Sequence, residues 1–368
     1  MVIWYEGCKL NMKKICFFVG NIDLPGGAER VTSVIANGLS ETGHTVVLLS
    51  LFKGKSPFFD LNPAIKLYQI FPEQVLFRKF YFTVVHQLRK FLSEYKIDVL
   101  VDVESILAAY ALPAVIGMGV RHICWEHLNY KNDLDRSVRK IARHLAAIFA
   151  DDVITLTRRD KEVWCKHTWM RANILAISNP IPFDIPDHSP NPNSTIALAV
   201  GRLTHVKGFD NLLKAWALIA MDVPPGWRLR IVGEGEDEQM LKALCCELGL
   251  NERVEFCPPT KNIGQHYSEA SFCCLTSRYE GLPMVLIEAQ AYGLSAIAFD
   301  CETGPREIIN DLESGYLVRP GDVSDFSRKM YRLIVDKNMR EKFSIKAKEN
   351  SFLFSDERII KQWNNLIG

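Results

Sequence analysis

The chain has 368 residues, of which 48% are hydrophobic, and its 44 lysines and arginines nearly balance 43 aspartates and glutamates. This length exceeds one ordinary α/β domain and suits two domains of about 150 to 200 residues each. The near-neutral charge lacks the strongly basic character typical of nucleic-acid binding, so no nucleic-acid partner is predicted.

The amino-terminal segment MVIWYEGCKLNMKK lacks the order of charge, apolar run and small cleavage site found in signal peptides. Met12 directly precedes two lysines, so we expect residues 1–11 to be a dispensable extension. Whether Met1 or Met12 is the true start stays open.

A glycine pair follows the first predicted strand, KICFFVG. Gly26 and Gly27 come before a helix expected to begin near Ala28. A backbone without Cβ atoms could approach a phosphate or a sugar closely at this helix start. The alternative interpretation is a tight strand-to-helix turn that requires glycine for its conformation.

Apolar strands and helical stretches alternate along nearly the whole chain. The predicted strands after the first are TVVLLSL, DVLVDV, RHICWEH, DDVITLT, IALAVG, LRIVGEG, RVEFC, SFCCLTS and SAIAFD. This pattern predicts an α/β fold with two parallel sheets wrapped by helices. The longest uncharged stretch, residues 105–120, is shorter than the roughly 20 residues of a membrane span and is expected to form a buried helix and turn.

The amino-terminal half is the basic one, with 23 lysines and arginines against 17 acidic residues in 1–180. Segment 76–96 mixes cations with aromatic residues, and a second basic helix is predicted through Arg136, Arg139, Lys140 and Arg143. Such surfaces can lie on anionic lipid, so this segment favours peripheral contact with a membrane. The alternative is the ordinary charged face of helices that cover a sheet.

His127 follows the predicted strand RHICWEH, at the sheet edge where open α/β domains bind ligands. It is a candidate site residue, although a packed or capping histidine is the alternative. Its neighbour Glu126 is expected to point the opposite way. Asp133-Leu134-Asp135 resembles a D-x-D metal motif, but an acidic helix start explains it better. Loops around 51–72 and 130–136 are expected to carry specificity, without a readable code.

Five prolines interrupt the strand–helix rhythm in SNPIPFDIPDHSPNPNS, residues 178–194. Proline excludes a helix there, so we expect domains over 1–180 and 181–355, with a final helix at 356–368. The ten cysteines show no metal-ligand spacing, so we predict neither a zinc site nor a disulfide framework. Most of them are expected to be small core residues in a reducing cytoplasm.

Two cations and two carboxylates mark the second half. Arg202 and Lys207 follow the strand IALAVG and flank a helix start, where they could bind a diphosphate. In SRYEGLPMVLIEA, Glu280 precedes a helix that Pro283 is expected to begin, and Glu288 lies within it. The first amides of that helix favour an anion, and two carboxylates suit the hydroxyls of a polyol. The predicted ligand-contacting positions around them are Gly281, Leu282, Met284 and Val285.

This ordered set resembles the retaining glycosyltransferases of family 4, which have the GT-B fold. Glu280 and Glu288 are similar to the family's E-x7-E motif, and GRLTHVKGFDNLLKA (201–215) to its G-R…K-G segment. LPGGAER (24–30) resembles the family's amino-terminal glycine loop, and CWEHLNY (124–130) the strand end that carries its histidine. IVGEGE and GYLV are further matches.

The resemblance implies two Rossmann-like, doubly wound parallel-sheet domains that face a cleft, with a final helix that crosses back to the first domain. It implies transfer of a hexose or N-acetylhexosamine from a nucleoside diphosphate sugar, with uridine the first candidate base, and retention of anomeric configuration. Arg202 and Lys207 would bind the diphosphate, Glu280 the donor sugar and Glu288 the ribose, while His127 would touch or orient the sugar. No cofactor and no metal are implied.

The family members that it resembles most build O-antigen, capsule or exopolysaccharide on a lipid diphosphate carrier, and lipopolysaccharide core is the next candidate acceptor. An alternative is a catalytically silent nucleotide-sugar-binding subunit of a polysaccharide assembly complex. A nicotinamide-dependent oxidoreductase would require G-x-G-x-x-G after a first strand, which VGNIDLPGG and IVGEGEDEQ lack. A nucleotide-sugar epimerase would share the fold but not the Glu280 to Glu288 spacing.

Overall fold

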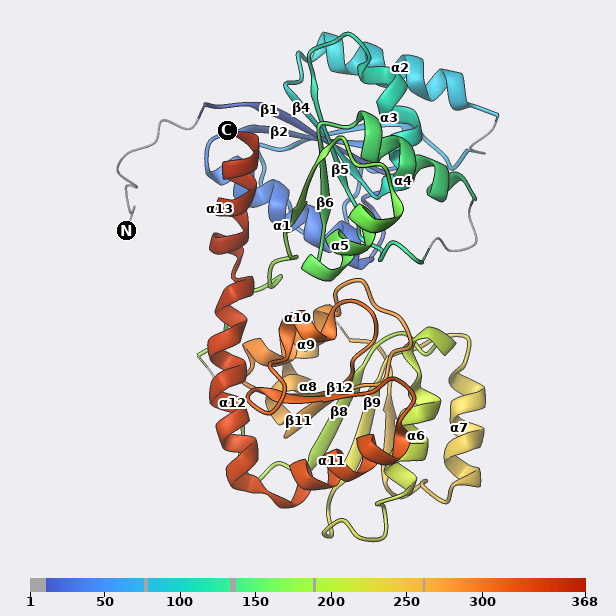
Figure 1. The fold of residues 1–368 in the computed structure, drawn as a ribbon, viewed down its shortest axis with the longest axis vertical. Helices are drawn as coiled ribbons and strands as arrows, with labels where there is room; N and C mark the ends of the chain where they lie inside the picture. The colour runs from blue at the N-terminus through green and yellow to red at the C-terminus, as the bar shows by residue number, and fades with distance from the viewer. Residues whose placement is uncertain (1–10, 76–78, 133–136, 188–189, 261) are drawn as a thin grey trace. The chain divides into compact units, whose positions relative to one another are not determined.

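The computed structural model describes residues 11–368 except 76–78, 133–136, 188–189 and 261. The chain divides into two compact units, drawn in Figure 1. Unit 1 comprises residues 1–182 and 356–368, and unit 2 comprises residues 183–355. We describe each unit by itself.

Unit 1 is a parallel sheet with helices on both faces. Its strands are β1 (Lys14–Val19), β2 (Thr45–Phe52), β3 (Lys66–Phe71), β4 (Val99–Val103), β5 (Arg121–Trp125), β6 (Asp152–Thr155) and β7 (Asn173–Ala176). Its helices are α1 (Gly27–Glu41), α2 (Tyr81–Glu94), η1 (Ser105–Leu107), α3 (Ala108–Val115), α4 (Ser137–Phe149), α5 (Arg158–His167) and α13 (Asp356–Ile367). The strand order is β3-β2-β1-β4-β5-β6-β7, so the direction of winding reverses between β1 and β4.

Unit 2 repeats this plan. Its strands are β8 (Ile196–Val200), β9 (Arg228–Val232), β10 (Val254–Cys257), β11 (Phe272–Leu275), β12 (Ser295–Phe299) and β13 (Gly315–Val318). Its helices are η2 (His205–Lys207), α6 (Phe209–Ala217), α7 (Glu238–Glu247), α8 (Ile263–Glu269), α9 (Met284–Ala291), α10 (Pro305–Ile308), α11 (Val323–Val335), α12 (Lys337–Ser351) and η3 (Phe352–Phe354). The order β10-β9-β8-β11-β12-β13 reverses between β8 and β11, and every pairing of named strands is parallel.

The central strands are apolar because both faces of each sheet are covered. Strand β1 is buried at every residue after Lys14, and β12 is buried throughout. Continuous apolar runs are typical of parallel strands between two helical layers. The two sheets confirm the predicted α/β class.

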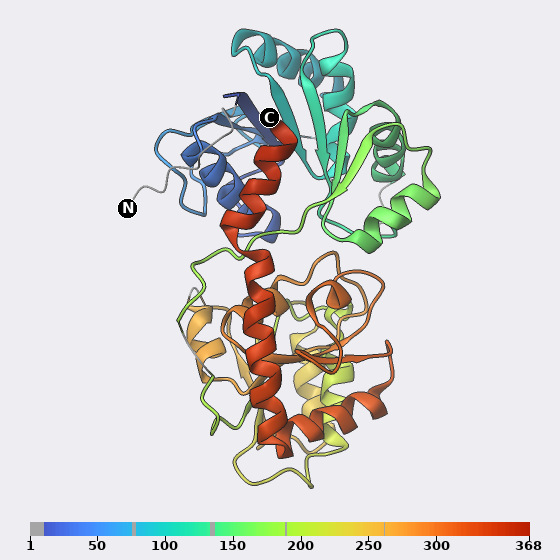
Figure 2. The ribbon, with the colours of Figure 1, turned by 60° about the vertical axis from the view of Figure 1, so that its left-hand side comes forward.

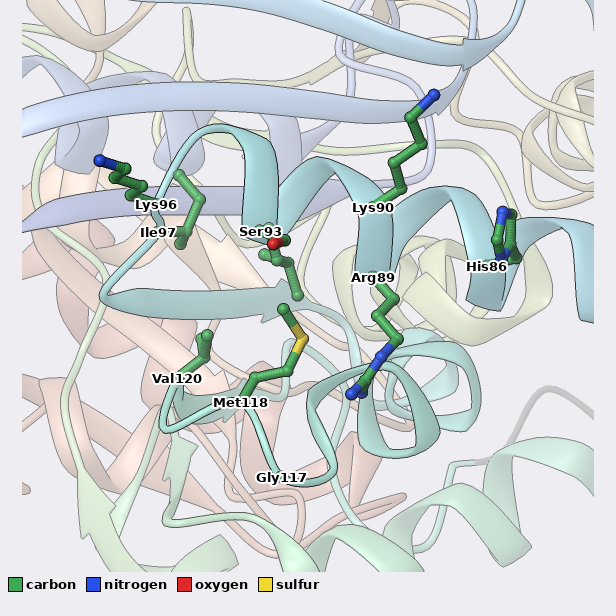
Figure 3. Close-up of a pocket in the computed structure, with 10 residues that line it drawn as sticks. His86, Arg89, Lys90, Ser93, Lys96, Ile97, Gly117, Met118 and Val120 are labelled. Atoms are coloured by element: carbon green, nitrogen blue, oxygen red, sulfur yellow. The ribbon is translucent and has the colours of Figure 1, made fainter.

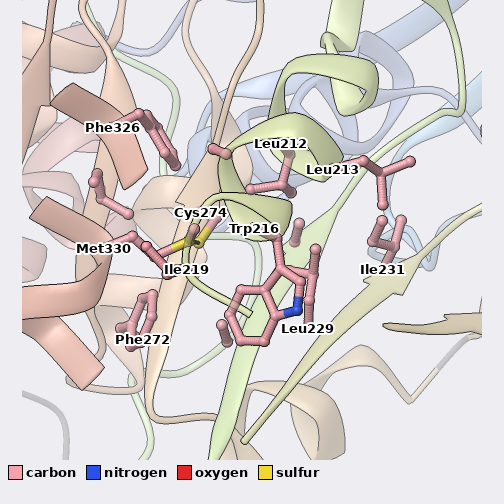
Figure 4. Close-up of a cluster of buried hydrophobic side chains, with 14 of the residues drawn as sticks. Leu212, Leu213, Trp216, Ile219, Leu229, Ile231, Phe272, Cys274, Phe326 and Met330 are labelled. Atoms are coloured by element: carbon pink, nitrogen blue, oxygen red, sulfur yellow. Dashed lines mark hydrogen bonds between the residues drawn. The ribbon is translucent and has the colours of Figure 1, made fainter. Parts of the chain in front are cut away.

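The core of unit 2 forms around Trp216 of α6 (Figure 4). Its indole is fully buried beside Leu229 of β9, and Phe272, Cys274 and Met330 belong to the same cluster. Burying a large apolar side chain contributes about 1.5–3 kcal/mol, so this cluster fixes the helices on the sheet.

The carboxyl-terminal helix α13 belongs to unit 1 and lies beside α1 (Figures 1 and 2). The Trp363 ring lies 4.8 Å from Trp125 and 6.2 Å from Phe17 between ring centroids. A Cβ on Gly38 would lie 1.8 Å from Cδ1 of Ile360, so only glycine allows this close approach of the two helices. The Asn364 amide also pairs with His44, at 3.0 Å.

One expectation about a loop was wrong in part. Residues 66–71, within the expected specificity loop 51–72, form the edge strand β3. All of its side chains except the exposed Lys66 are only partly buried, because an edge strand covers less of the core. Its segment KLYQIF therefore lacks the long apolar run that identified the central strands.

Candidate functional site

The site in unit 2 lies at the edge where β8 and β11 end. Ligands of open parallel sheets bind beyond the carboxyl ends of strands where the winding reverses. The loops after these two strands, residues 201–208 and 276–283, meet there. They hold Arg202, Lys207 and Glu280, and the second loop leads directly into α9, which holds Glu288.

Lys207 and Glu280 contact each other directly. The Lys207 Nζ donates to Oε1 of Glu280 at 2.7 Å, although 73 positions separate them in the chain. The Glu280 side chain is 8% exposed and that of Lys207 is 27% exposed. This charge-assisted bond holds the ammonium at the strand edge, where it can also meet a phosphate. Arg202, the other predicted cation, follows the end of β8 and is exposed.

Arg278, in the loop after β11, contacts both Asp210 in the first turn of α6 and the loop after β8, and sequence reasoning missed both residues. Nη1 and Nη2 of Arg278 each donate to an Asp210 oxygen at 2.9 Å, and Nη1 also donates to the His205 carbonyl at 2.6 Å. Burial alone would raise the pKa of Asp210, but the bonds and charge of Arg278 outweigh it and hold that pKa below its ordinary value. The fork thus fixes the loop that carries Lys207 against the loop that carries Glu280.

Glycines allow the backbone loops of this edge to pack at contact distance. Gly208 has φ +65°, and a Cβ there would lie 2.1 Å from the carbonyl oxygen of Thr276. Gly233 has φ +151°, and its Cβ would lie 2.0 Å from the Gly201 oxygen. The backbones of the segments GRLTHVKG and IVGEGE therefore pack directly against each other.

The α9 helix begins one residue later than predicted, at Met284, with Pro283 in the capping position. Within the described chain no side chain caps this helix start, and the first amides of a helix have no partner inside the helix. Leu282 is buried and Gly281 is partly buried in the preceding turn. The Thr303 hydroxyl donates to the Glu280 carbonyl, which fixes that turn.

Glu288 is buried within α9 and receives a hydrogen bond from a tyrosine. The Tyr267 hydroxyl donates to Oε2 of Glu288 at 2.8 Å, and the Tyr267 ring stacks on Tyr292 at 5.4 Å. Glu288 is only 6% exposed, so contacts within the protein set the orientation of its carboxylate. Sequence reasoning missed Tyr267 because it comes from α8, before the motif.

The corresponding edge of unit 1 lies beyond β1, β4 and β5. Gly26 caps α1 with extended backbone, and Gly27 is the first helical residue. A Cβ on Gly26 would lie 2.1 Å from Oε2 of Glu29, whereas a Cβ on Gly27 would meet nothing within 4 Å. Gly26 thus accommodates the Glu29 carboxylate, and Gly27 leaves open space at the helix start.

His127 follows β5 at this edge. Its residue is partly exposed, but its Nε2 atom is buried and has no hydrogen-bond partner in the described chain. The imidazole lies 4.3 Å from the Trp125 ring between centroids. Burial lowers the pKa of His127 to about 4, and the nearby Glu126 only partly opposes this effect. The ring is therefore neutral at pH 7, so it can accept or donate one hydrogen bond.

Glu126 turns inward and anchors a buried ionic network. Its carboxylate accepts from Nε of Arg143 at 2.8 Å and from the Ser105 hydroxyl. Arg139 lies 3.7 Å away and also donates to Glu104 at 2.9 Å. Burial alone would raise the pKa of Glu126, but the two guanidiniums outweigh it and hold that pKa below its ordinary value.

This network corrects the prediction of a basic α4 surface. Arg139 and Arg143 are each 1% exposed, so neither can meet a lipid headgroup. The two guanidiniums are buried because they balance the charge of the fully buried Glu126 carboxylate. The exposed side of α4 instead carries Lys140 and the apolar residues Ile141 and Phe149. Arg136, and Asp133 and Asp135 of the D-x-D segment, lie outside the described residues.

A cavity of about 590 Å³ lies away from both strand-end edges (Figure 3). It is lined by α2 and the turn before β5, with the basic side chains His86, Arg89, Lys90 and Lys96. The Arg89 guanidinium is engaged with the carbonyls of Ala114 and Ile116. The cavity is at the amino-terminal edge of the sheet, so we do not assign it to the site above.

The described residues contain no group of three His, Cys, Asp or Glu side chains placed to hold a metal ion. None of their helices combines the length and apolar character needed to cross a bilayer.

Comparison with known proteins identifies the family. The model "Glycosyltransferase Family 4" matches residues 25–184, and "Glycosyl transferases group 1" matches residues 181–350. An uncharacterized glycosyltransferase of Haemophilus influenzae is 33% identical over 97% of this chain and 100% of its own length. This chain belongs to the GT-B glycosyltransferases.

Other similar proteins act in bacterial glycan synthesis. The amylovoran biosynthesis glycosyltransferase AmsD of Erwinia amylovora is 32% identical, over 97% of this chain and all of that protein. A Campylobacter jejuni N-acetylgalactosaminyltransferase, named for a diphospho-undecaprenol-linked acceptor, is 28% identical over 97% and 99% of the two chains. The structure of the lipopolysaccharide outer core galactosyltransferase WaaB, apo form, aligns with a TM-score of 0.78 at 25% identity, over 96% and 99%. The predicted membership of the glycosyltransferases with the GT-B fold is therefore confirmed.

Proposed function

We propose that this glycosyltransferase moves a hexose or N-acetylhexosamine from a nucleoside diphosphate sugar to a lipid-linked glycan, with retention of anomeric configuration. The Lys207–Glu280 contact carries the donor part of the proposal. It joins a cation suited to phosphate with a carboxylate suited to sugar hydroxyls at the β8–β11 reversal. UDP-sugars are the first donors to test.

The proposed roles follow from position and charge. Lys207, Arg202 and the α9 amides at Met284 and Val285 would stabilise the diphosphate as its bond to C1 of the sugar breaks. Glu280, with Gly281 and Leu282 shaping its turn, would bind donor hydroxyls. Glu288 would bind the ribose hydroxyls, held in orientation by Tyr267.

The bond changes are balanced within one donor and one acceptor. The C1–O bond to the β-phosphate breaks, the acceptor oxygen bonds to the same face of C1, and the acceptor proton passes to the departing phosphate. The charge that appears is that of the diphosphate, so the groups needed are the cations and helix amides of unit 2. We propose that no metal is needed for this step.

Unit 1 would bind the acceptor. His127 is neutral at pH 7, so it suits a hydrogen bond to a sugar oxygen better than charge stabilisation. Gly26 and Gly27 would allow a sugar or phosphate to approach the start of α1. The match to a relative named for a diphospho-undecaprenol-linked acceptor supports a lipid-linked acceptor in O-antigen, capsule or exopolysaccharide synthesis.

A membrane surface would hold this acceptor, and α2 is the element we propose for contact with the inner leaflet of the cytoplasmic membrane. Phe82 of α2 is 84% exposed, and the cations Lys90 of α2 and Lys96, which follows it, are also exposed. Each cation near anionic lipid contributes about 1 kcal/mol, and an inserted aromatic ring adds apolar burial.

Sedimentation with vesicles tests the membrane contact. The chain should sediment with phosphatidylglycerol vesicles and should not sediment with phosphatidylcholine vesicles. Phe82→Ser with Lys90→Gln should weaken that binding, while Met221→Ser, which replaces a 91% exposed residue of unit 2, should not. Equal binding of all three proteins would reject α2 as the contact.

The enzymatic proposal is tested by release of nucleoside diphosphate from UDP-, GDP- and ADP-sugars, with and without a lipid diphosphate-linked glycan. The native chain is compared with Glu280→Ala and with Glu247→Gln, an exposed carboxylate of α7 as control. We expect turnover of one donor that the acceptor stimulates, that chelator leaves unchanged and that collapses only in Glu280→Ala. Proton NMR of the product should show the donor's anomeric configuration.

Binding of a nucleotide sugar without turnover under any acceptor would favour the silent scaffold subunit instead. An inverted product would reject the retaining mechanism while leaving the donor site intact.

A further inference from the structure

Glu104 occupies the place in unit 1 where a ligand of a doubly wound sheet is expected. It directly follows β4, which pairs with β1 on one side and β5 on the other. Val103 is aligned with Trp125, and the Glu104 amide donates to the Trp125 carbonyl at 2.9 Å. Glu104 therefore leaves the sheet beside Glu126 and His127, at the reversal between β1 and β4.

The backbone of Glu104 is held in a conformation that favours glycine. Its φ is 83° and its ψ is 132°, a region that residues with a Cβ rarely adopt. Such outliers persist only where surrounding contacts fix them, and they gather at ligand-binding positions. Here the fixing contacts are the bond to β5 and the Leu107 amide, which donates to the Glu104 carbonyl at 3.1 Å.

The side chain of Glu104 is held at one oxygen only. Nη2 of Arg139 donates to Oε2 of Glu104 at 2.9 Å, and this guanidinium is buried. In the described residues Oε1 of Glu104 has no hydrogen-bond partner, and the side chain is 34% exposed. A buried arginine thus holds one oxygen of a carboxylate whose side chain is 34% exposed.

The charge of Glu104 also acts on a second carboxylate of this edge. Glu29, in the first turn of α1, has a raised pKa, chiefly from burial and with a contribution from the charge of Glu104. The carboxylate of Glu126 is buried and accepts hydrogen bonds from Arg143 and Ser105. Of these three carboxylates, Glu104 is the one anchored by a buried cation and still partly exposed.

We infer that Glu104 binds a hydroxyl of the acceptor sugar, through Oε1, and that Arg139 is its positioning residue. This inference rests on the proposed role of unit 1 in acceptor binding. A carboxylate accepting from a sugar hydroxyl forms a charge-assisted bond, and its removal should weaken binding about tenfold or more.

Direct binding tests the inference without any turnover. Octyl α-galactoside and octyl α-N-acetylgalactosaminide are titrated into the full chain by calorimetry, and UDP is titrated separately. Glu104→Gln keeps the size of the side chain and an oxygen that can accept from Arg139, but it loses the charge. Glu104→Asp keeps the charge on a side chain that is one methylene shorter. Glu41→Gln, at the exposed end of α1, is the matched control.

We expect Glu104→Gln to bind at least one glycoside about tenfold more weakly, Glu104→Asp to bind it severalfold more weakly, and both to bind UDP like the native chain. Native-like glycoside binding by both variants, or no glycoside binding by the native chain at millimolar concentration, would overturn the inference. So would an equal loss of UDP and glycoside affinity, because it would mean a general structural role. Failure of UDP to bind the native chain would reject the donor proposal alone.

Discussion

Replacing Arg143 should destabilise unit 1 more than any exposed substitution on the same helix. The guanidinium is 1% exposed and donates to Oε2 of Glu126 at 2.8 Å and to the carbonyls of Asn129, Tyr130 and Asn132. Arg143→Met removes all of these donors and leaves the fully buried Glu126 with a more distant cation, Arg139, at 3.7 Å.

The expected cost is about 3–5 kcal/mol, the usual penalty for removing one partner of a buried ion pair. The loop that follows His127 should open first, because three of its carbonyls lose their donor. Hydrogen exchange monitored by mass spectrometry measures both effects: the amides of residues 128–132 report the loop, and those of β5 report unit 1. Since Arg143 holds the pKa of Glu126 low, the variant should also protonate Glu126 at higher pH.

Lys140→Met is the matched control, on the exposed face of α4, and it should change stability by less than about 0.5 kcal/mol. Arg143→Met with Glu126→Gln should cost less than the sum of the two single changes, because the buried charge is then gone. A loss below about 1 kcal/mol in Arg143→Met would refute the reasoning that this network fixes the loop.

Three further predictions concern single side chains. Tyr267→Phe removes the donor to Glu288 and should weaken UDP binding about three- to tenfold by calorimetry, with Tyr331→Phe unchanged; equal affinities would dissociate Tyr267 from the site. Gly208→Ala should lower the melting temperature of unit 2 more than Gly249→Ala, because both have φ near +65° but only the Gly208 Cβ would meet a backbone atom, 2.1 Å away; similar losses would contradict this. His127 has a folded pKa of about 4 against 6.5 unfolded, so the unfolded chain binds more protons and stability falls as the pH drops below 6.5, by about 2 kcal/mol at pH 5. That component should vanish in His127→Gln, and an identical pH profile of unfolding would show that the imidazole is not buried.

The sequence predicts the features that depend on local pattern. The apolar runs identify the central strands, and the glycines of GRLTHVKG and IVGEGE mark loops that pack backbone to backbone. Two parallel sheets and the glycosyltransferase family are confirmed. The edge strand β3 was missed because its side chains are only partly buried.

Contacts between distant segments were not predictable in the same way. The spacing of Arg139 and Arg143 suits an exposed basic helix equally well, and only the buried Glu126 on β5 explains why they turn inward. The paired hydrogen bonds from Arg278 to Asp210 join a loop to the start of α6, 68 positions away in the chain. The strained backbone of Glu104 has no sequence signal, because glutamate does not favour that conformation.

The central claim is that a nucleotide sugar binds unit 2 at the reversal between β8 and β11. Hydrogen exchange of the full chain with and without UDP tests it directly, since the amides of Met284 and Val285 and the loop 201–208 should become protected. This protection should disappear in the double variant Lys207→Ala with Glu280→Ala, while β10, at the edge of the sheet, should exchange as before. Protection centred elsewhere in the chain, or none in the native protein with any nucleotide sugar, would contradict it.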